Sequence, residues 1–507
     1  MKEDLRRPER RSLSLRIALA ISLMAGFYLF AVSLVGVLLW LVYFQLAVAH
    51  RLHLGIVAVC LAGAFAVLKG CLFVGGRFEA PGPEILEKDE PRLFAVIRDV
   101  TERMGGRAVS KVYFIPDVNA FVAEAGGVIG HLGSRRVMAV GIGLLNTDSI
   151  GQFRATLAHE LGHFEGGDTR LSGFVCRTRA SIGRVIGQLG ENSWLSIPFD
   201  VYGRLFMRIT QSIGRRQELD ADRYSIRIAG RKAHVEGLKS EGVGGVLFER
   251  FLDTEVVPLL QEGFIPTNLY DGFRQFLANL GEDGVAREVE GALHRLSTDP
   301  YDSHPALAER LAFAGTVDDQ EIAEEPEIAR SLLENPGEIE RNLTVRILTP
   351  ALAQLRIRNG VKPVEWQDVA ERVYSVRMAR TSEEVAGALG QPGGGAIDAL
   401  LRGLESEDPV AFAHLFASQA FRDPCDDARD VARAVLRQVL LARIGSILVA
   451  RKAFRWETSP GRPLGLVDST GASIDLDTLI AAAVQERGAV PALRERLAGL
   501  GLTGSAG

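Results

Sequence analysis

The chain of 507 residues is poor in cysteine, and its cysteines are far apart. The four are Cys60, Cys71, Cys176 and Cys425. None stands at the short spacing of zinc-binding cysteine pairs, and four scattered thiols form no recognisable disulfide framework. Cysteine zinc sites and disulfide-stapled secreted domains are therefore excluded, and the cysteine usage is compatible with a reducing compartment.

The chain also lacks a strong charge of either sign. Its net charge is −5, so the composition gives no reason to expect a nucleic acid or another polyanion as a partner. The length is sufficient for two or three domains.

Charge is absent altogether from residues 17–49, which follow a basic tail at residues 1–16. At about 1.5 Å per residue, this apolar run exceeds the roughly 30 Å of a bilayer core, and a second apolar run follows a short turn. We expect transmembrane spans at about 17–45 and 54–73, as an uncleaved anchor rather than a secretory signal. The alternative is a buried hairpin of a soluble protein.

The distribution of lysine and arginine predicts the orientation of this hairpin. The tail at residues 1–16 is richer in these residues than the turn around Arg51, so the N-terminus is expected in the cytoplasm. Two spans return the chain to the same side. Everything after about residue 78 is therefore predicted to be cytoplasmic, on an integral protein of the plasma or inner membrane.

The sequence contains the pattern His-Glu-x-x-His at His159, Glu160 and His163. On a helix, residues four apart share one face, so both imidazoles can bind the same metal ion. Zinc accepts such ligands and keeps one position open in a catalytic site. Glu160 lies beside this face, where it can act as a general base on a water. The same five-residue pattern also occurs by chance on surface helices, so the neighbouring sequence must decide whether it is a metal-binding motif.

The surroundings favour a helix at this position. Thr147, Asp148 and Ser149 are candidate N-caps, and Gly166-Gly167 ends the helical pattern just after the second histidine. Asp168 follows this stop. It can orient a histidine ligand through a hydrogen bond, or it is a solvated aspartate of a turn.

A third metal ligand is expected on another element. The best candidates are Glu218 and Asp222, four residues apart in a second helical pattern. One of them can bind the metal while the other orients a ligand histidine from behind. An ordinary charged helix face has the same pattern.

These motifs together resemble peptidase family M48, the gluzincin-type membrane metallopeptidases that include HtpX-like proteases and the CAAX prenyl endopeptidases. Besides His159-Glu160-x-x-His163 and Glu218-x-x-Ala221-Asp222, the sequence has Asn119-Ala120-Phe121 after a predicted strand, Asp168 five residues after His163, and Ser303-His304-Pro305 with Arg310. The resemblance covers roughly residues 80–315 and does not reach the C-terminal part.

The resemblance implies one zinc ion per chain, held by His159, His163 and Glu218, with Glu160 as the general base. Asp222 and Asp168 would orient the histidines. His304 would donate a hydrogen bond to the developing oxyanion, although a histidine that caps the helix begun by Pro305 is an alternative. Asn119 and its segment would contact a peptide substrate bound as an extended strand.

The remaining patterns predict an α+β protein that is mainly α with a small sheet. A two-helix anchor (17–77) precedes a zincin-like metallopeptidase domain (78–316) with strands at 111–115 and 137–142. A mainly helical region of unknown role follows (317–507). Residues 194–209 are amphipathic, and they form an interfacial helix near lipid or an ordinary core helix.

Two functions remain. The first is a membrane-anchored zinc metalloendopeptidase that hydrolyses protein or peptide substrates, for which the resemblance also suggests quality control of membrane proteins. The second is a catalytically silent membrane scaffold that keeps the fold for binding. A scaffold has no need of a base between two zinc ligands, so the presence of Glu160 favours the enzyme.

Overall fold

A computed structural model describes the chain outside residues 1–9, 51–52, 73–78, 126–134, 166–168, 191–192, 296–304, 319–321, 356, 358–359, 392–393, 407, 418–426, 475 and 504–507. The fold is mainly helical with small sheets, as predicted. It has two compact units, Met1–Phe248 with Gly284–Pro336, and Glu249–Asp283 with Gly337–Gly507.

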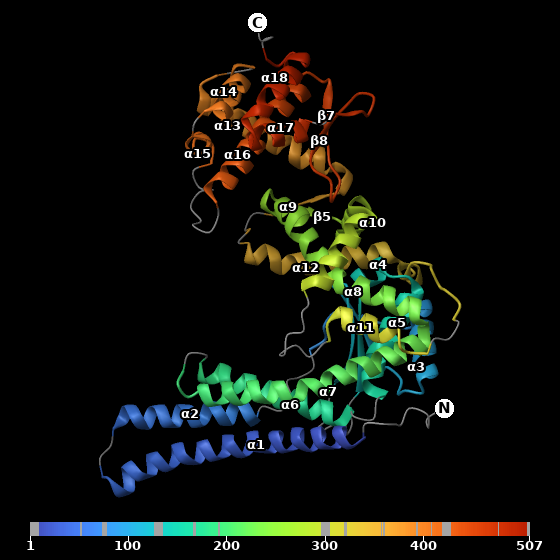
Figure 1. Ribbon diagram of the computed structural model, residues 1–507, viewed down its shortest axis with the longest axis vertical. Helices are drawn as coiled ribbons and strands as arrows, with labels where there is room; N and C mark the ends of the chain where they lie inside the picture. Colours follow the sequence, from blue (N-terminus) through green and yellow to red (C-terminus); the bar gives the residue numbers. More distant parts are fainter. Residues whose placement is uncertain are drawn as a thin grey trace. The chain divides into compact units, whose positions relative to one another are not determined.

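In the first unit, four helices pack side by side around an apolar core (Figure 1). They are α1 (Arg10–Tyr43), α2 (Leu54–Leu72), α6 (Thr169–Leu189) and α7 (Ile197–Ala229). Ala18–Val48 and Leu54–Cys71 are long and apolar enough to cross a membrane, close to the two predicted spans. The core includes Phe27, Ala31, Leu38, Ala64, Val67, Ile182, Val185, Phe199 and Phe206.

The amphipathic stretch 194–209 forms the start of α7. Its inner face packs against α1, where the rings of Phe199 and Phe30 lie 5.1 Å apart. Its outer face leaves Ile197 and Val201 exposed by 59% and 62%. One helix therefore combines a core face with an uncovered apolar face.

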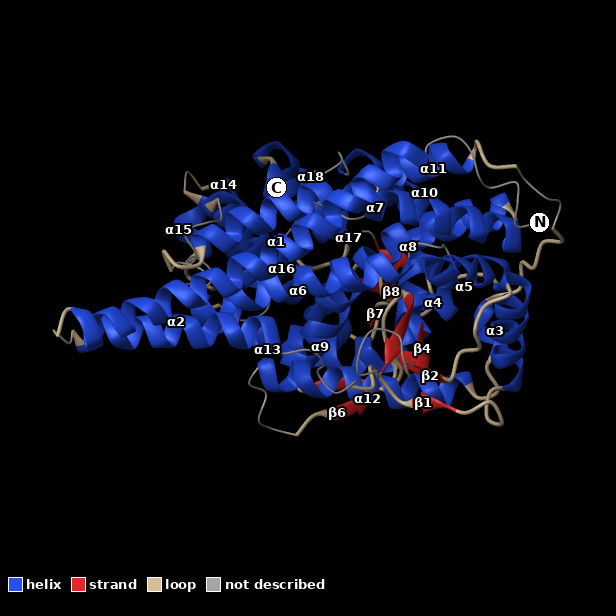
Figure 2. Cartoon of the chain, turned by 90° about the horizontal axis from the view of Figure 1, so that it is seen from below, coloured by secondary structure: helices blue, strands red, loops and turns tan. Residues whose placement is uncertain are grey.

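The first unit also contains a four-stranded sheet with the order β1-β2-β4-β3 (strands red in Figure 2). The strands are β1 (Glu84–Ile85), β2 (Lys111–Ile115), β3 (Ala120–Ala125) and β4 (Arg135–Gly141). β2 coincides with a predicted strand and β4 overlaps the other. β4 pairs in parallel with β2 and antiparallel with β3. β3 is therefore an edge strand.

The first unit also contains the helices α3 (Pro91–Met104), α4 (Ile142–Thr147), α5 (Ile150–Glu165) and α11 (Leu307–Ala314), with a short 3-10 helix at Ala329–Leu332. The chain passes between the two units within α8 (Arg231–Phe251), within α10 (Leu269–Arg295) and again after Pro336.

The start of α5 is set by a reciprocal cap. The Ser149 hydroxyl accepts a hydrogen bond from the Gln152 amide (3.2 Å), and the Gln152 side chain accepts one from the Ser149 amide (2.6 Å). This capping box satisfies two backbone donors that a helix start leaves open. The Ile150 amide donates to the Glu327 carbonyl (2.7 Å), which satisfies another. Ser149, one of the three predicted caps, is thus the N-cap.

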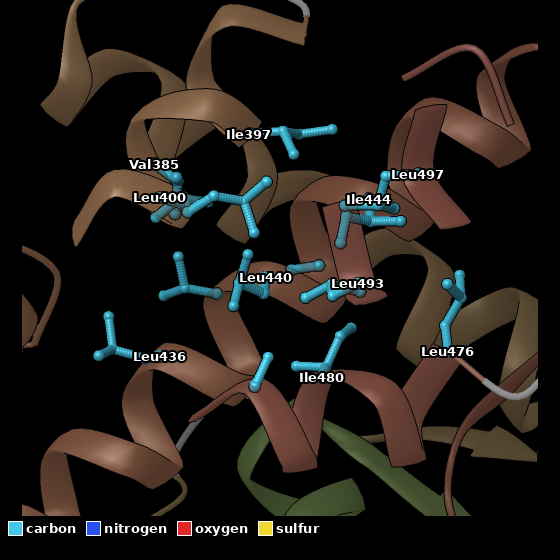
Figure 3. Packing of buried hydrophobic residues seen from close by; sticks show 14 of the residues in the cluster. Val385, Ile397, Leu400, Leu436, Leu440, Ile444, Leu476, Ile480, Leu493 and Leu497 are labelled. Atoms are coloured by element: carbon cyan, nitrogen blue, oxygen red, sulfur yellow. The ribbon is translucent and has the colours of Figure 1, made fainter. Parts of the chain in front are cut away.

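The second unit is built mainly from helices. They are α9 (Val257–Gln261), α12 (Pro336–Gln354), α13 (Val376–Leu389), α14 (Gly394–Glu405), α15 (Pro409–Ala413), α16 (Ala428–Ala450), α17 (Leu476–Gln485) and α18 (Val490–Gly499). Short π or 3-10 turns lie at Leu252–Val256, Ala370–Ser375, Trp366–Asp368 and Arg487–Ala489. Figure 3 shows side chains of α13, α14, α16, α17 and α18 converging on one core.

Two small sheets complete this unit. β5 (Phe264–Pro266) pairs with β6 (Lys362–Val364), and β7 (Phe454–Glu457), β8 (Gly465–Asp468) and β9 (Ser473–Ile474) form an antiparallel sheet. The sequence predicts a mainly helical C-terminal region and no particular strand in it, so β6, β7, β8 and β9 are additional to that prediction.

Asp148 immediately precedes the cap of α5 and is fully buried. Its Oδ1 accepts hydrogen bonds from Ser240 (2.6 Å) and Thr147 (3.2 Å), whereas Oδ2 has no partner among the described residues. Burial raises the pKa of this carboxyl to about 7, although the two hydroxyl hydrogen bonds act to lower it. The helix that carries His-Glu-x-x-His therefore begins beside a carboxyl that resists ionisation.

We predict that Asp148→Asn raises the unfolding free energy relative to the wild type by more at pH 8 than at pH 5. An unfolded aspartate loses its proton near pH 3.9, whereas folded Asp148 keeps it until about pH 7. Between these pH values the folded chain binds more protons than the unfolded chain. As the pH rises through this range, the wild type therefore loses up to about 1.4 kcal/mol of unfolding free energy per pH unit. Melting temperatures of both proteins in detergent at pH 5, 6.5 and 8 measure the difference, with exposed Asp89→Asn as the control. A constant difference would contradict the assignment.

Candidate metal centre

The predicted metal ligands lie on two helices that cross closely. α5 carries His159, Glu160 and His163, and the second half of α7 carries Glu218 and Asp222. Both halves of the predicted constellation are therefore helical, as the four-residue spacings indicated.

The close crossing depends on small residues. A Cβ atom on Gly162 would lie 3.1 Å from the Ala221 Cα and 3.3 Å from the Tyr224 side chain, so a larger residue there would push the helices apart. The Ser225 hydroxyl of α7 also donates to the Ala155 carbonyl of α5 (2.7 Å). These contacts bring a glutamate within reach of two histidines that are more than 50 residues away in the sequence.

The three expected ligands meet at one point. His159 Nε2 lies 3.4 Å from one Glu218 carboxylate oxygen, and His163 Nε2 lies 3.7 Å from the other. One ligand atom from each residue lies within 4.8 Å of the others. With zinc bonds of about 2.0–2.1 Å, tetrahedral ligands lie roughly 3.3–3.4 Å apart. The donor set and its spacing therefore fit a zinc ion.

Asp222 contacts His159 from behind. Its Oδ1 lies 3.0 Å from His159 Nδ1, on the opposite side of the ring from Glu218. A proton on Nδ1 would leave the lone pair of Nε2 free to bind metal. The predicted positioning role of Asp222 is consistent with this geometry.

Arg310 of α11 holds Asp222 in turn. Its Nε and Nη2 donate to the two Asp222 oxygens at 3.1 and 2.6 Å, in the forked geometry that suits a carboxylate. Arg310 belongs to one of the motifs quoted above, but the sequence gives it no expected role. The only sequence signal that could have identified Arg310 was its spacing after Pro305. No local pattern shows that its side chain reaches Asp222.

The electrostatics of these groups follow from burial and pairing. Burial acts to raise the pKa of Asp222, but the hydrogen bonds from His159 and Arg310 outweigh it and lower the pKa to about 2. For His159, burial acts to lower the pKa, and the bonds to Asp222 and Glu218 raise it to about 10. A metal ion would compete with that proton, because a histidine ligand must be neutral.

Glu160 has an environment that suits a base at neutral pH. Burial raises its pKa to about 7; His159 acts to lower it, and the carboxylates of Glu241 and Glu218 act to raise it. The amide of Val122, on edge strand β3, donates a hydrogen bond to the Glu160 carboxylate. The base therefore lies directly beside the open edge of the sheet.

The other predicted site residues are placed differently. Asn119 lies exposed at the start of β3, and its side-chain oxygen accepts a hydrogen bond from the Ala120 amide (2.7 Å). Asp168 and His304 lie outside the described residues. The structure thus brings together His159, Glu160, His163, Glu218 and Asp222.

The fold and the site together define a cluster of two histidines and one glutamate, carried on two crossed helices, that can hold a metal ion. Residues 87–317 match the model of peptidase family M48.

Similar proteins include protease HtpX of Escherichia coli K12, which is 29% identical over 190 residues. This match covers 31% of the present chain and 62% of the relative. Protease HtpX of Buchnera aphidicola is 27% identical over 174 residues, covering 30% and 58%. The chain thus spans about three fifths of the length of these relatives. No solved structure matches it significantly.

We predict that Glu218→Ala abolishes stoichiometric zinc binding, because it removes one of three protein ligands. Asp222→Ala should weaken zinc binding about 10–100-fold and keep residual metal, because it removes only the orienting partner of His159. Asp220→Ala, on the same helix, is the matched control. Zinc is measured by mass spectrometry and by competition with a chelating dye. Full zinc in Glu218→Ala would show that another residue is the third ligand.

Proposed function

We propose that this protein is a membrane-anchored zinc metalloendopeptidase that hydrolyses peptide bonds with Glu160 as the general base. The observation that carries the proposal is the convergence of His159, His163 and Glu218, from two helices, beside a buried glutamate whose pKa is near 7. The match to peptidase family M48 and the similarity to proteases named HtpX support it.

The residues have distinct tasks in this mechanism. His159, His163 and Glu218 would hold the ion, and zinc supplies a Lewis acid that activates water and polarises a carbonyl group. Glu160 takes the proton of the attacking water and passes it to the leaving amine. Asp222, held by Arg310, keeps His159 in the orientation that binds metal.

The substrate is proposed to bind along β3 as an additional strand. β3 pairs with β4 on one side, and no described strand pairs with its other side. The Val122 amide on β3 contacts Glu160, so a peptide paired with this edge would pass directly over the base. Main-chain hydrogen bonds would hold the peptide extended, and side-chain pockets would set its sequence preference.

His304 and Asn119 complete the proposed site. The proposal gives His304 the role of a hydrogen-bond donor to the developing oxyanion, in addition to the metal. The Asn119 segment, which leads into β3, would contact the substrate. The exposed position of Asn119 at the start of the edge strand supports that role.

Membrane anchoring by α1 and α2 is part of the proposal. These helices leave large apolar side chains exposed along much of their length, including Leu29 (68%), Leu54 (72%) and Phe65 (66%). Water would be an unfavourable solvent for such a surface, whereas lipid tails would cover it. The N-terminus and the metal centre are proposed to lie on the cytoplasmic side.

We predict that Glu160→Gln retains zinc and loses roughly 10²–10⁴-fold in kcat, because an amide cannot accept the proton of water. The test compares cleavage of an unfolded model protein by the purified full-length chain and the variant, with zinc content measured in both. Exposed Glu102→Gln is the control. Wild-type turnover by zinc-loaded Glu160→Gln would exclude the mechanism and favour the scaffold.

The orientation is tested by cysteine labelling. In a background in which the four native cysteines are serine, a cysteine replacing exposed Glu383 should react with a membrane-impermeant maleimide only after the cells are permeabilised. The reason is the excess of basic residues in the N-terminal tail, which favours a cytoplasmic location for everything after the hairpin. Labelling of intact cells would reverse the proposed topology.

A further inference from the structure

A small pocket opens behind α5, beside the proposed ligand His159. Its wall includes Thr156 of α5, His234, Leu238 and Glu241 of α8, and Arg310 of α11. The metal-binding function needs none of the three α8 side chains. Because a metal ligand forms part of its wall, a side chain in this pocket would lie next to the bond that is cut.

His234 presents a hydrogen-bond acceptor here. The ring is only 2% exposed, and its Nδ1 lies 2.9 Å from the Ser225 hydroxyl. That hydroxyl already donates its single proton to the Ala155 carbonyl, so it can only accept from His234 Nδ1–H. In the neutral ring, Nε2 then carries a lone pair.

The Nε2 atom has no hydrogen-bond partner within the described residues, although it is buried. The Oδ1 atom of Asp222 lies 3.7 Å away and is itself an acceptor. A buried nitrogen without a partner is costly, so a donor is missing at this point.

Glu241 adds a second acceptor and a negative charge. In the described part of the chain, no hydrogen bond or ion pair engages its carboxylate, which nevertheless lies near enough to Arg310 and Glu160 to influence both. The charge of Arg310 is already paired with Asp222 through two hydrogen bonds. Glu241 is therefore the acid of this pocket without a counter-charge.

We propose that this pocket binds the positively charged side chain of a substrate residue next to the scissile bond, a lysine or an arginine. An ammonium or guanidinium group supplies several donors and no acceptor, which matches two acceptors that lack partners. It also supplies the positive counter-charge that the Glu241 carboxylate lacks. The inference rests on the proposed peptidase function and names the substrate class that this chain prefers.

The experiment uses the full-length zinc-loaded chain and matched pairs of fluorogenic peptides. In each pair one residue flanking the cleaved bond is lysine or methionine, which are both long and unbranched. For the wild type, the lysine peptide should be cleaved with a kcat/KM at least about tenfold higher at one flanking position. Glu241→Gln should remove most of this ratio. His234→Asn, which keeps a donor near Ser225 but lacks Nε2, should reduce the ratio less.

Glu236→Gln, an exposed acid on the same helix, is the control and should keep the wild-type ratio. No preference for lysine or arginine at either position, or a preference that survives Glu241→Gln, would overturn the proposal.

Binding provides a measurement that does not depend on turnover. In the Glu160→Gln background, fluorescence anisotropy should show tighter binding of the lysine peptide than of the methionine peptide, and Glu241→Gln should abolish the difference. If the wild type cleaves nothing while this binding difference persists, the peptidase function fails and the basic subsite stands. Equal binding of both peptides overturns the subsite whatever the wild type cleaves.

Discussion

The close crossing of α5 and α7 is the contact on which the site depends. Two of the proposed metal ligands lie on one helix and the third on the other, so the distance between the helices sets whether these residues can share an ion. Gly162 provides no side chain at the contact, and Ala221 opposes it with a small one. The hydrogen bond from Ser225 to Ala155 fixes the relative position of the helices at a second point.

Burial of charge is the second constraint, and it explains why α11 is part of the site. Asp222 has no exposure to solvent, and an isolated carboxylate there would be strongly destabilising. The forked contact from Arg310 and the hydrogen bond with His159 keep it ionised. The same contacts connect three separate helices to one point, so the orientation of the metal ligand depends on the packing of the whole unit.

α7 connects this centre to the apolar four-helix bundle. Phe206 is buried among α1, α2 and α6, and Glu218 follows twelve residues later on the same continuous helix. At 1.5 Å per residue, this is about 18 Å along the helix axis. If α1 and α2 lie in a membrane, as proposed, the packing of α7 against them sets the distance of the proposed metal ligands from it. Substrate access would then come from the membrane surface and the open edge of β3.

The sequence by itself determined those features that depend on local periodicity and chain length. The four-residue spacings placed His159 with His163 and Glu218 with Asp222, and uninterrupted apolar length identified α1 and α2. β2 and β4 followed from short apolar runs with β-branched residues. The short strands β7, β8 and β9 could not be recognised in the same way, because two to four residues are too few to show a period.

Only the tertiary structure decided which distant groups meet. Arg310 reaches Asp222 from 88 positions away, and Ser225 joins His234 to the carbonyl of Ala155. That Glu241 of α8 lacks a positive counter-charge becomes apparent only once the partners of Arg310 are known. Hydrogen bonds and charge pairs of this kind depend on side-chain directions after packing, and no spacing along the chain specifies them.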